Sequence, residues 1–237
     1  MTERGMIFNT DMVRAILDGR KTQTRRIMAI QPEHSELGLR RVIDSKNGRD
    51  SGKYFWSQSD ARGLKMRSKV FGCPYGEVGD RIWVRETYQG PLFDYEHMES
   101  YLEDSSKFEK SDFCVYRADG KPAPEFCDAD DNLHCGWRPS IHMPRWASRI
   151  TLEITDVRVE RLNTISEEDA RAEGIIDGGC LNCGEPEPCG CANPEPDATD
   201  AFAYLWQSIY GQENWNANPW VWVIEFKRIE GGDHATN

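Results

Sequence analysis

The alternation of apolar residues in three segments constrains the fold of this chain more than any other feature. Ile82 and Val84 alternate with polar or aromatic neighbours, and residues 150–161 repeat this strand pattern. Residues 219–229 form an apolar run that we expect to be a strand buried on both faces. The helical segments between them are short and irregularly spaced, and no glycine-rich phosphate loop follows a strand. The pattern therefore predicts an α+β domain with a mixed sheet or small barrel.

Three short helices are expected beside these strands. The first covers residues 10–18, where Asn9 or Thr10 caps the free amides and Gly19 supplies a left-handed stop. The second begins after Ser166, a good cap, and the third is the strongly amphipathic stretch of residues 200–210.

The chain is interpreted as one domain over residues 1–230, followed by a short tail. Two segments lack a clear period and are expected to be insertions, at about residues 31–70 and 90–135. The first is expected to hold loops and a hairpin, and the second is acidic and aromatic. A cysteine-rich loop, with almost no apolar residues, covers residues 176–198.

The charge of the chain is unevenly distributed. The formal net charge is −11, yet residues 1–70 carry 15 Lys/Arg and 8 Asp/Glu, a net of +7. A basic face of this kind is compatible with a phosphate-bearing partner, and equally with pairing to the acidic remainder of the same chain. No apolar run approaches the roughly 20 residues that span a bilayer, and no secretory segment is recognised. We therefore expect a cytoplasmic protein without a membrane partner.

Four blocks of sequence resemble a known family. In order they are "ILDGRKTQTRR", "GDRIWVRE", "ISEEDARAEGI" and "VIEFKRI", and together they are similar to an ASCH domain of the PUA-like superfamily. The long form, with "WRPSIHMPRWASRITLEITDVRVERL" in the middle, is similar to proteins encoded by bacteriophages and prophages. The resemblance implies a PUA-like mixed β-barrel with short flanking helices, working in a bacterial host cytoplasm.

The same resemblance implies a catalytic site. The family includes small bacterial amidohydrolases that remove the acyl group from N4-acetylcytidine. Their proposed catalytic residues fall on Lys21 and Thr24 in the "GRKTQT" corner and on Glu173 at the end of "SEEDARAEG". The ordinary alternative is a solvated basic turn and an exposed carboxylate at a helix end.

Elementary chemistry limits which of these three residues can act as the nucleophile and which as the base. A threonine hydroxyl needs a base to become a nucleophile, and a desolvated lysine has a lowered pKa that suits this task. A carboxylate within salt-bridge distance would raise the pKa of Lys21 and weaken it as a base. Either Glu173 handles the proton itself or a water molecule bridges the two, and the sequence leaves both open.

Further residues are candidates for binding a substrate. Guanidinium groups suit phosphate, an exposed indole stacks on a base, and a carboxylate can accept a hydrogen bond from a base amino group. These candidates are Arg25, Arg26, Trp83, Arg85, Glu86 and His142. For each, an ordinary structural role stays open, such as a salt bridge, a core position or a hydrogen-bonded loop.

The cysteine-rich loop predicts a metal site. Four cysteines stand at C-x2-C-x5-C-x-C spacing, namely Cys180, Cys183, Cys189 and Cys191. Disulfides are rare in cytoplasmic proteins. Four thiolates that bind one tetrahedral zinc ion would instead order this loop, which has no apolar core of its own. We expect one structural zinc and no organic cofactor, with free thiols as the alternative. A second group of Cys114, Cys127, His134 and Cys135 is a weaker candidate.

Three functions are compatible with these observations. The first is recognition of a nucleobase or nucleoside by an amidohydrolase that acts on N4-acylated cytidine or another modified base. The second is a non-catalytic RNA- or DNA-binding module, with RNA favoured over DNA. The third is a phage accessory protein that binds a host protein. The sequence indicates no oligomeric state.

Overall fold

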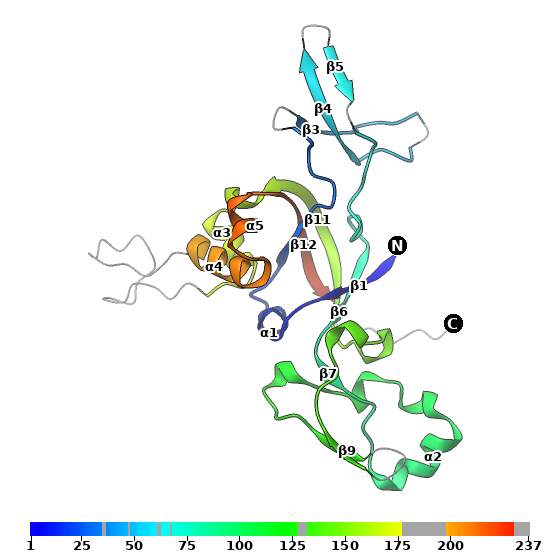
Figure 1. Ribbon diagram of the computed structural model, residues 1–237. Helices are drawn as coiled ribbons and strands as arrows, with labels where there is room; N and C mark the ends of the chain where they lie inside the picture. The colour runs from blue at the N-terminus through cyan, green and yellow to red at the C-terminus, as the bar shows by residue number, and fades with distance from the viewer. Residues whose placement is uncertain are drawn as a thin grey trace, which may run out of the picture.

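The computed structural model describes residues 1–34, 37–46, 48–60, 63–66, 68–127, 132–176 and 198–229 of the chain. They form a central five-stranded sheet with helices beside it (Figure 1). The two expected insertions extend from opposite ends of this body. The mixture of helices and strands is the α+β class that the sequence predicts.

The central sheet has the strand order β1-β6-β11-β12-β2. Its strands are β1 (Glu3–Ile7), β6 (Arg81–Arg85), β11 (Thr151–Arg161), β12 (Trp220–Ile229) and β2 (Gln23–Ile27). Strand β1 pairs with β6 in parallel, and the other pairs are antiparallel. The described strands do not close into a barrel, so β1 and β2 are edges. The sequence pattern had not indicated β1.

Strand β11 is one long strand with a bulge. Ile154 is buried in the main core, yet Val157 and Val159, which pack against the same core, have the opposite parity. The register with β12 shifts between Ile154 and Asp156. One extra residue at this bulge moves the core-facing positions from even to odd numbers, because strand side chains alternate with period two.

Strand β12 is buried on both faces, as its continuous apolar run predicts. Trp222 and Ile224 belong to the main core, which also receives side chains from β1, β6 and α1 (Thr10–Leu17). Val221 and Val223 point to the other face and belong to a second core. The sheet therefore separates two apolar layers, and β12 contributes to each.

Helices α3 (Glu167–Ala172), α4 (Ala198–Tyr210) and α5 (Gln212–Asn216) lie together on one side of the sheet (Figure 1). The predicted caps are confirmed: Asn9 Oδ1 accepts from the Met12 amide at 2.8 Å, and Ser166 Oγ accepts from the Asp169 amide at 3.1 Å. Helix α5 had not been expected. Within the described ranges, no helix is long and apolar enough to cross a bilayer.

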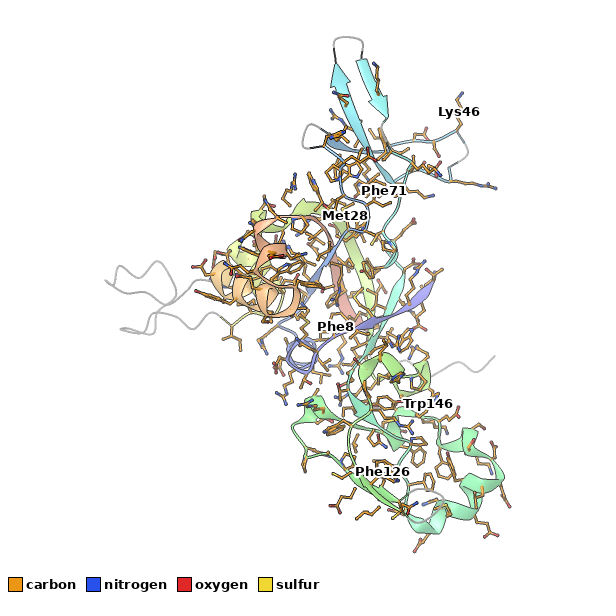
Figure 2. All side chains as sticks on the ribbon, viewed as in Figure 1. Phe8, Met28, Lys46, Phe71, Phe126 and Trp146 are labelled. Carbon is orange, nitrogen blue, oxygen red and sulfur yellow. The ribbon has the colours of Figure 1, made fainter. Side chains whose placement is uncertain are left out.

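The first insertion is a small sheet and not only a hairpin. It has the order β3-β4-β5, with β3 (Gly38–Arg41), β4 (Tyr54–Asp60) and β5 (Gly63–Met66). Trp56 attaches it to the body, with its ring 5.4 Å from that of Trp220 and its indole N–H donating to the Ile30 carbonyl. Figure 2 shows Phe71 near this junction and Lys46 at the periphery.

The second insertion and the residues just before it contain short elements around aromatic side chains. They are β7 (Tyr88–Gln89), α2 (Met98–Glu103), β8 (Val115–Tyr116), β9 (Glu125–Cys127) and β10 (Leu133–Cys135). Tyr88 and Tyr116 form a small core with Met143 and Ala147. Helix α2 lies within this acidic segment and has no buried residue.

Candidate functional site

The corner between α1 and β2 meets the end of α3. Gly19 has a φ of 76° and ends α1, and the Thr22 amide donates to the Ala172 carbonyl at 2.9 Å. Gly174 has a φ of 91°, and a Cβ there would lie 2.8 Å from the Ala15 Cβ and 3.1 Å from the Lys21 Cβ. A glycine is therefore required at residue 174, both for its backbone conformation and for this close approach.

Lys21 and Glu173 form a buried ion pair at this junction. The Lys21 Nζ lies 2.5 Å from Glu173 Oε2 and 2.8 Å from the Glu173 carbonyl oxygen. The two side chains are 0% and 3% exposed. Burial lowers the pKa of Lys21, and the attraction of Glu173 opposes this effect. The contact is direct, without the bridging water that the sequence had left open.

This burial corrects one expectation. A solvated turn was the ordinary alternative for Lys21 and Thr24, but the two residues are only 2% and 1% exposed. Thr24 lies in the edge strand β2, opposite Ile224. Both residues are part of the packed body of the domain, so substitutions at either one affect stability as well as any chemistry.

Thr24 and Glu173 line one narrow cleft beside β2. Arg25, Arg26 and Met12 also line it, and helix α4 forms the opposite wall with Phe202, Leu205, Trp206, Ile209 and Tyr210. The free space is about 20 Å³, which is room for about one water molecule. A nucleoside does not fit while α4 keeps this position.

Several buried polar atoms of the residues that line the cleft lack hydrogen-bond partners within the described part of the chain. Two of them, Arg25 Nη1 and Glu173 Oε1, lie 3.6 Å apart. An unsatisfied buried polar group costs about 1–3 kcal/mol, and more when it is charged. A water molecule or a polar ligand atom would therefore be favourable between these two groups.

Arg25 is already neutralised by carboxylates on the α3 side of the sheet. Its Nη2 lies 3.1 Å from Glu160 Oε2 and 2.9 Å from Asp169 Oδ2. Arg158 binds the other Asp169 oxygen at 3.0 Å. Partial burial acts to raise the pKa of Asp169, but Arg25 and Arg158 hold it below its ordinary value. Arg25 is fully buried and does not form a surface phosphate clamp.

Arg26 links the two edges of the sheet. Its Nη2 donates to the Ile7 carbonyl at 2.8 Å, and its guanidinium carbon lies 5.4 Å from the centre of the Phe8 ring. It is partly exposed and lines the cleft. Of the predicted substrate-binding residues, Arg25 and Arg26 are therefore the two that reach this site.

Trp83 and Arg85 do not line the cleft. Trp83 is half-buried on β6, where Gly5 leaves room for its ring. The guanidinium carbons of Arg85 and Arg145 lie 5.4 Å and 6.0 Å from the centre of its ring. Trp83 therefore packs against the guanidinium groups of Arg85 and Arg145, outside the main core.

Glu86 and His142 also lie outside the cleft lining. Glu86 is buried and accepts two hydrogen bonds from Arg149, at 3.0 Å and 3.1 Å. Burial raises the pKa of Glu86, and Arg149 opposes the shift. His142 is exposed, and its backbone carbonyl lies 3.5 Å from the Tyr88 hydroxyl. These contacts anchor the second insertion and the loop before β11.

The predicted zinc ligands lie outside the described residues. Cys180, Cys183, Cys189 and Cys191 all fall between residues 176 and 198, so the zinc site stays a prediction from the sequence. Of the weaker group, Cys127 and Cys135 are exposed on β9 and β10. No group of three or more His, Cys, Asp or Glu side chains suited to a metal ion occurs among the described residues.

Sequence reasoning missed the carboxylates behind the cleft. Asp169 was not among the candidate residues, although its side chain binds Arg25 and Arg158. Glu160 stands in the β11 strand segment and also binds Arg25. The alternating charges of "RVER", residues 158–161, were the available signal for ion pairs. They do not show which arginine pairs with Glu160.

No family model, curated protein or solved structure matches this chain. The resemblance to an ASCH domain therefore stays a prediction that depends on the four sequence blocks.

Proposed function

We propose that the protein recognises a modified nucleobase or nucleoside in the β2 cleft and hydrolyses an acylated base, with N4-acylated cytidine as the leading substrate. The observation that carries the proposal is the buried Lys21–Glu173 pair beside Thr24. Glu173 lines the cleft, and its Oε1 has no hydrogen-bond partner among the described residues, while its Oε2 contacts Lys21.

The direct ion pair assigns the proton-transfer role to Glu173 in this proposal. Lys21 is engaged by the carboxylate, so it positions Glu173. Thr24 Oγ attacks the acyl carbon and passes its proton to Glu173 Oε1. The tetrahedral intermediate then expels the base amine, which takes that proton, and leaves an acyl ester on Thr24.

Water completes the reaction by the same path. It attacks the ester, Glu173 accepts its proton and returns it to the Thr24 oxygen, and the carboxylic acid leaves. Arg25 Nη1 would donate to the oxyanion in both halves, because it is charged and has no hydrogen-bond partner among the described residues. The net change is amide plus water to amine plus carboxylic acid.

Substrate entry in this proposal requires movement of α4. The present free space of about 20 Å³ holds about one water molecule. Phe202 and Trp206 of α4 wall the cleft and pack against Val221 and Val223. A shift of this helix from the sheet would widen the cleft without breaking the sheet itself.

We further propose that the sheet belongs to the PUA-like class. The order of the four sequence blocks supports this assignment. The hydrogen bond from Arg26 to the Ile7 carbonyl also supports it, because it joins residues of the two edge strands that barrel closure would bring together.

The test is hydrolysis of N4-acetylcytidine and other N-acylated nucleosides, followed by mass spectrometry. Thr24→Ala and Glu173→Gln should each lower turnover by about 100-fold or more. Glu86→Gln is the matched control, because Glu86 is also a buried carboxylate paired with an arginine but does not line the cleft. A wild type that hydrolyses none of these nucleosides would refute the enzymatic proposal.

A second candidate is a non-catalytic nucleic-acid reader. Basic side chains are exposed on the first insertion, namely Arg40, Arg41, Lys46, Arg49 and Lys69. Such side chains suit phosphate contacts, and each lost contact lowers the salt dependence of binding by about one unit of slope. Salt-sensitive RNA binding that weakens in an Arg40→Ala, Arg41→Ala variant, without any hydrolysis, would favour the reader.

A further inference from the structure

The second insertion contains a cavity that the proposed nucleoside site does not use. Its volume is about 630 Å³, within the range of ligand pockets, which is roughly 300–1,000 Å³. Phe93, Phe113 and Phe126 line it together with Leu92 and Met98. Figure 2 shows Phe126 within this insertion, well separated from the central sheet.

The aromatic rings that line the cavity pack against other side chains and are still partly exposed. Phe108 is buried, and the centre of its ring lies 4.9 Å from those of both Phe93 and Phe113. Phe126 stacks on His134 at 5.5 Å. Phe93, Phe113 and Phe126 are themselves only half-buried. The cavity therefore has aromatic walls that are preorganised and still accessible.

Negative charge predominates in the second insertion. Residues 90–135 carry 12 Asp/Glu and 4 Lys/Arg. Asp94 and Glu125 line the cavity, are exposed, and form no ion pair with a described residue. An aromatic face attracts a cation, and carboxylates at the rim add to this attraction. A phosphate-bearing ligand would be repelled by the same groups.

We propose that this cavity binds a basic segment of a partner protein, with an arginine or lysine side chain among the phenylalanine rings. Asp94 and Glu125 bind the cationic end, and Leu92 and Met98 contact an apolar neighbour in the segment. The volume accommodates more than one side chain, which agrees with a peptide better than with a small inorganic cation.

The first test measures binding of a short fluorescein-labelled peptide of alternating arginine and leucine by anisotropy. A peptide with neutral citrulline in place of arginine should bind at least about tenfold more weakly, and added salt should weaken the arginine peptide. Asp94→Asn, Glu125→Gln should weaken it about fivefold to tenfold. Glu109→Gln, Asp112→Asn is the matched control, because it removes the same charge from the insertion outside the cavity lining.

The second test locates the peptide on the wild-type protein. Cys127 lines the cavity, whereas Cys135, on the paired strand, does not, and both are exposed. Bound arginine peptide should slow alkylation of Cys127 by N-ethylmaleimide and leave Cys135 unchanged, as read by mass spectrometry of the digested protein. This comparison does not depend on any variant folding.

Three results would overturn the proposal. They are equal binding of the arginine and citrulline peptides, equal loss of binding in the two double variants, and alkylation of Cys127 that the peptide does not change. Salt-sensitive self-association in sedimentation, blocked by the peptide, would instead identify the basic first insertion of a second copy as the occupant.

Discussion

Replacement of Lys21 by methionine is the sharpest test of the buried ion pair. Methionine keeps most of the side-chain volume and removes the charge, so Glu173 loses its contact at 2.5 Å. Removing one partner of a buried pair typically costs about 3–5 kcal/mol, because the remaining charge is left uncompensated. Arg25 Nη1 remains 3.6 Å from Glu173 Oε1, so we expect the lower end, about 3 kcal/mol.

The double variant Lys21→Met, Glu173→Met separates the charge effect from packing. Both charges are then absent, and Arg25 keeps Glu160 and Asp169 as partners. Hydrophobic replacement of a whole buried pair is often close to neutral, so the double variant should lie within about 1–2 kcal/mol of wild type. Glu173→Met alone leaves Lys21 uncompensated and should also cost about 3 kcal/mol. The two single losses then exceed the loss in the double variant by a coupling energy of about 4–5 kcal/mol.

Urea unfolding followed by circular dichroism measures these free energies in a double-mutant cycle. The midpoint should fall clearly for Lys21→Met and recover in the double variant at unchanged m-value. A loss below about 1 kcal/mol for Lys21→Met would refute the reasoning. Additive losses in the double variant would show that the two charges are not coupled in the folded protein.

Two further predictions concern pH and metal. Hydrogen bonds from Thr2, and less strongly from the Glu77 amide and Arg4, hold the pKa of Asp80 far below its ordinary value. Its folded pKa is therefore lower than its unfolded pKa. Its contribution to stability is present above about pH 4 and is lost at more acidic pH. The urea midpoint of Asp80→Asn should fall less between about pH 6 and pH 3 than that of wild type. Elemental analysis should find about one zinc per chain, and unchanged zinc in Cys180→Ser, Cys183→Ser would contradict the predicted ligands.

Local patterns were sufficient for much of the secondary structure. The caps at Asn9 and Ser166 and the stop at Gly19 act through neighbouring backbone groups, so they could be read directly from the chain. The alternation of apolar residues in β6 likewise indicated one buried face, and the continuous apolar run of β12 indicated two buried faces. These features depend on contacts within a few residues or on solvent exclusion alone.

The elements that were missed depend on distant partners. Strand β1 has a single buried residue, Met6, and therefore no alternating signal. It is a strand because β6 supplies its hydrogen bonds. The three strands of the first insertion show the same weak pattern, and Trp56 attaches them to the body.

The sequence by itself determined the α+β class, and it nominated Lys21, Thr24 and Glu173 as candidate residues. Tertiary structure alone decided that Lys21 and Glu173, 152 residues apart, form a direct buried pair. It also decided that α4 narrows the cleft, and that Trp83 and Glu86 bind neighbouring arginines away from it. The physical reason is that propensity and periodicity act locally, whereas desolvation and charge pairing depend on which distant segments pack together.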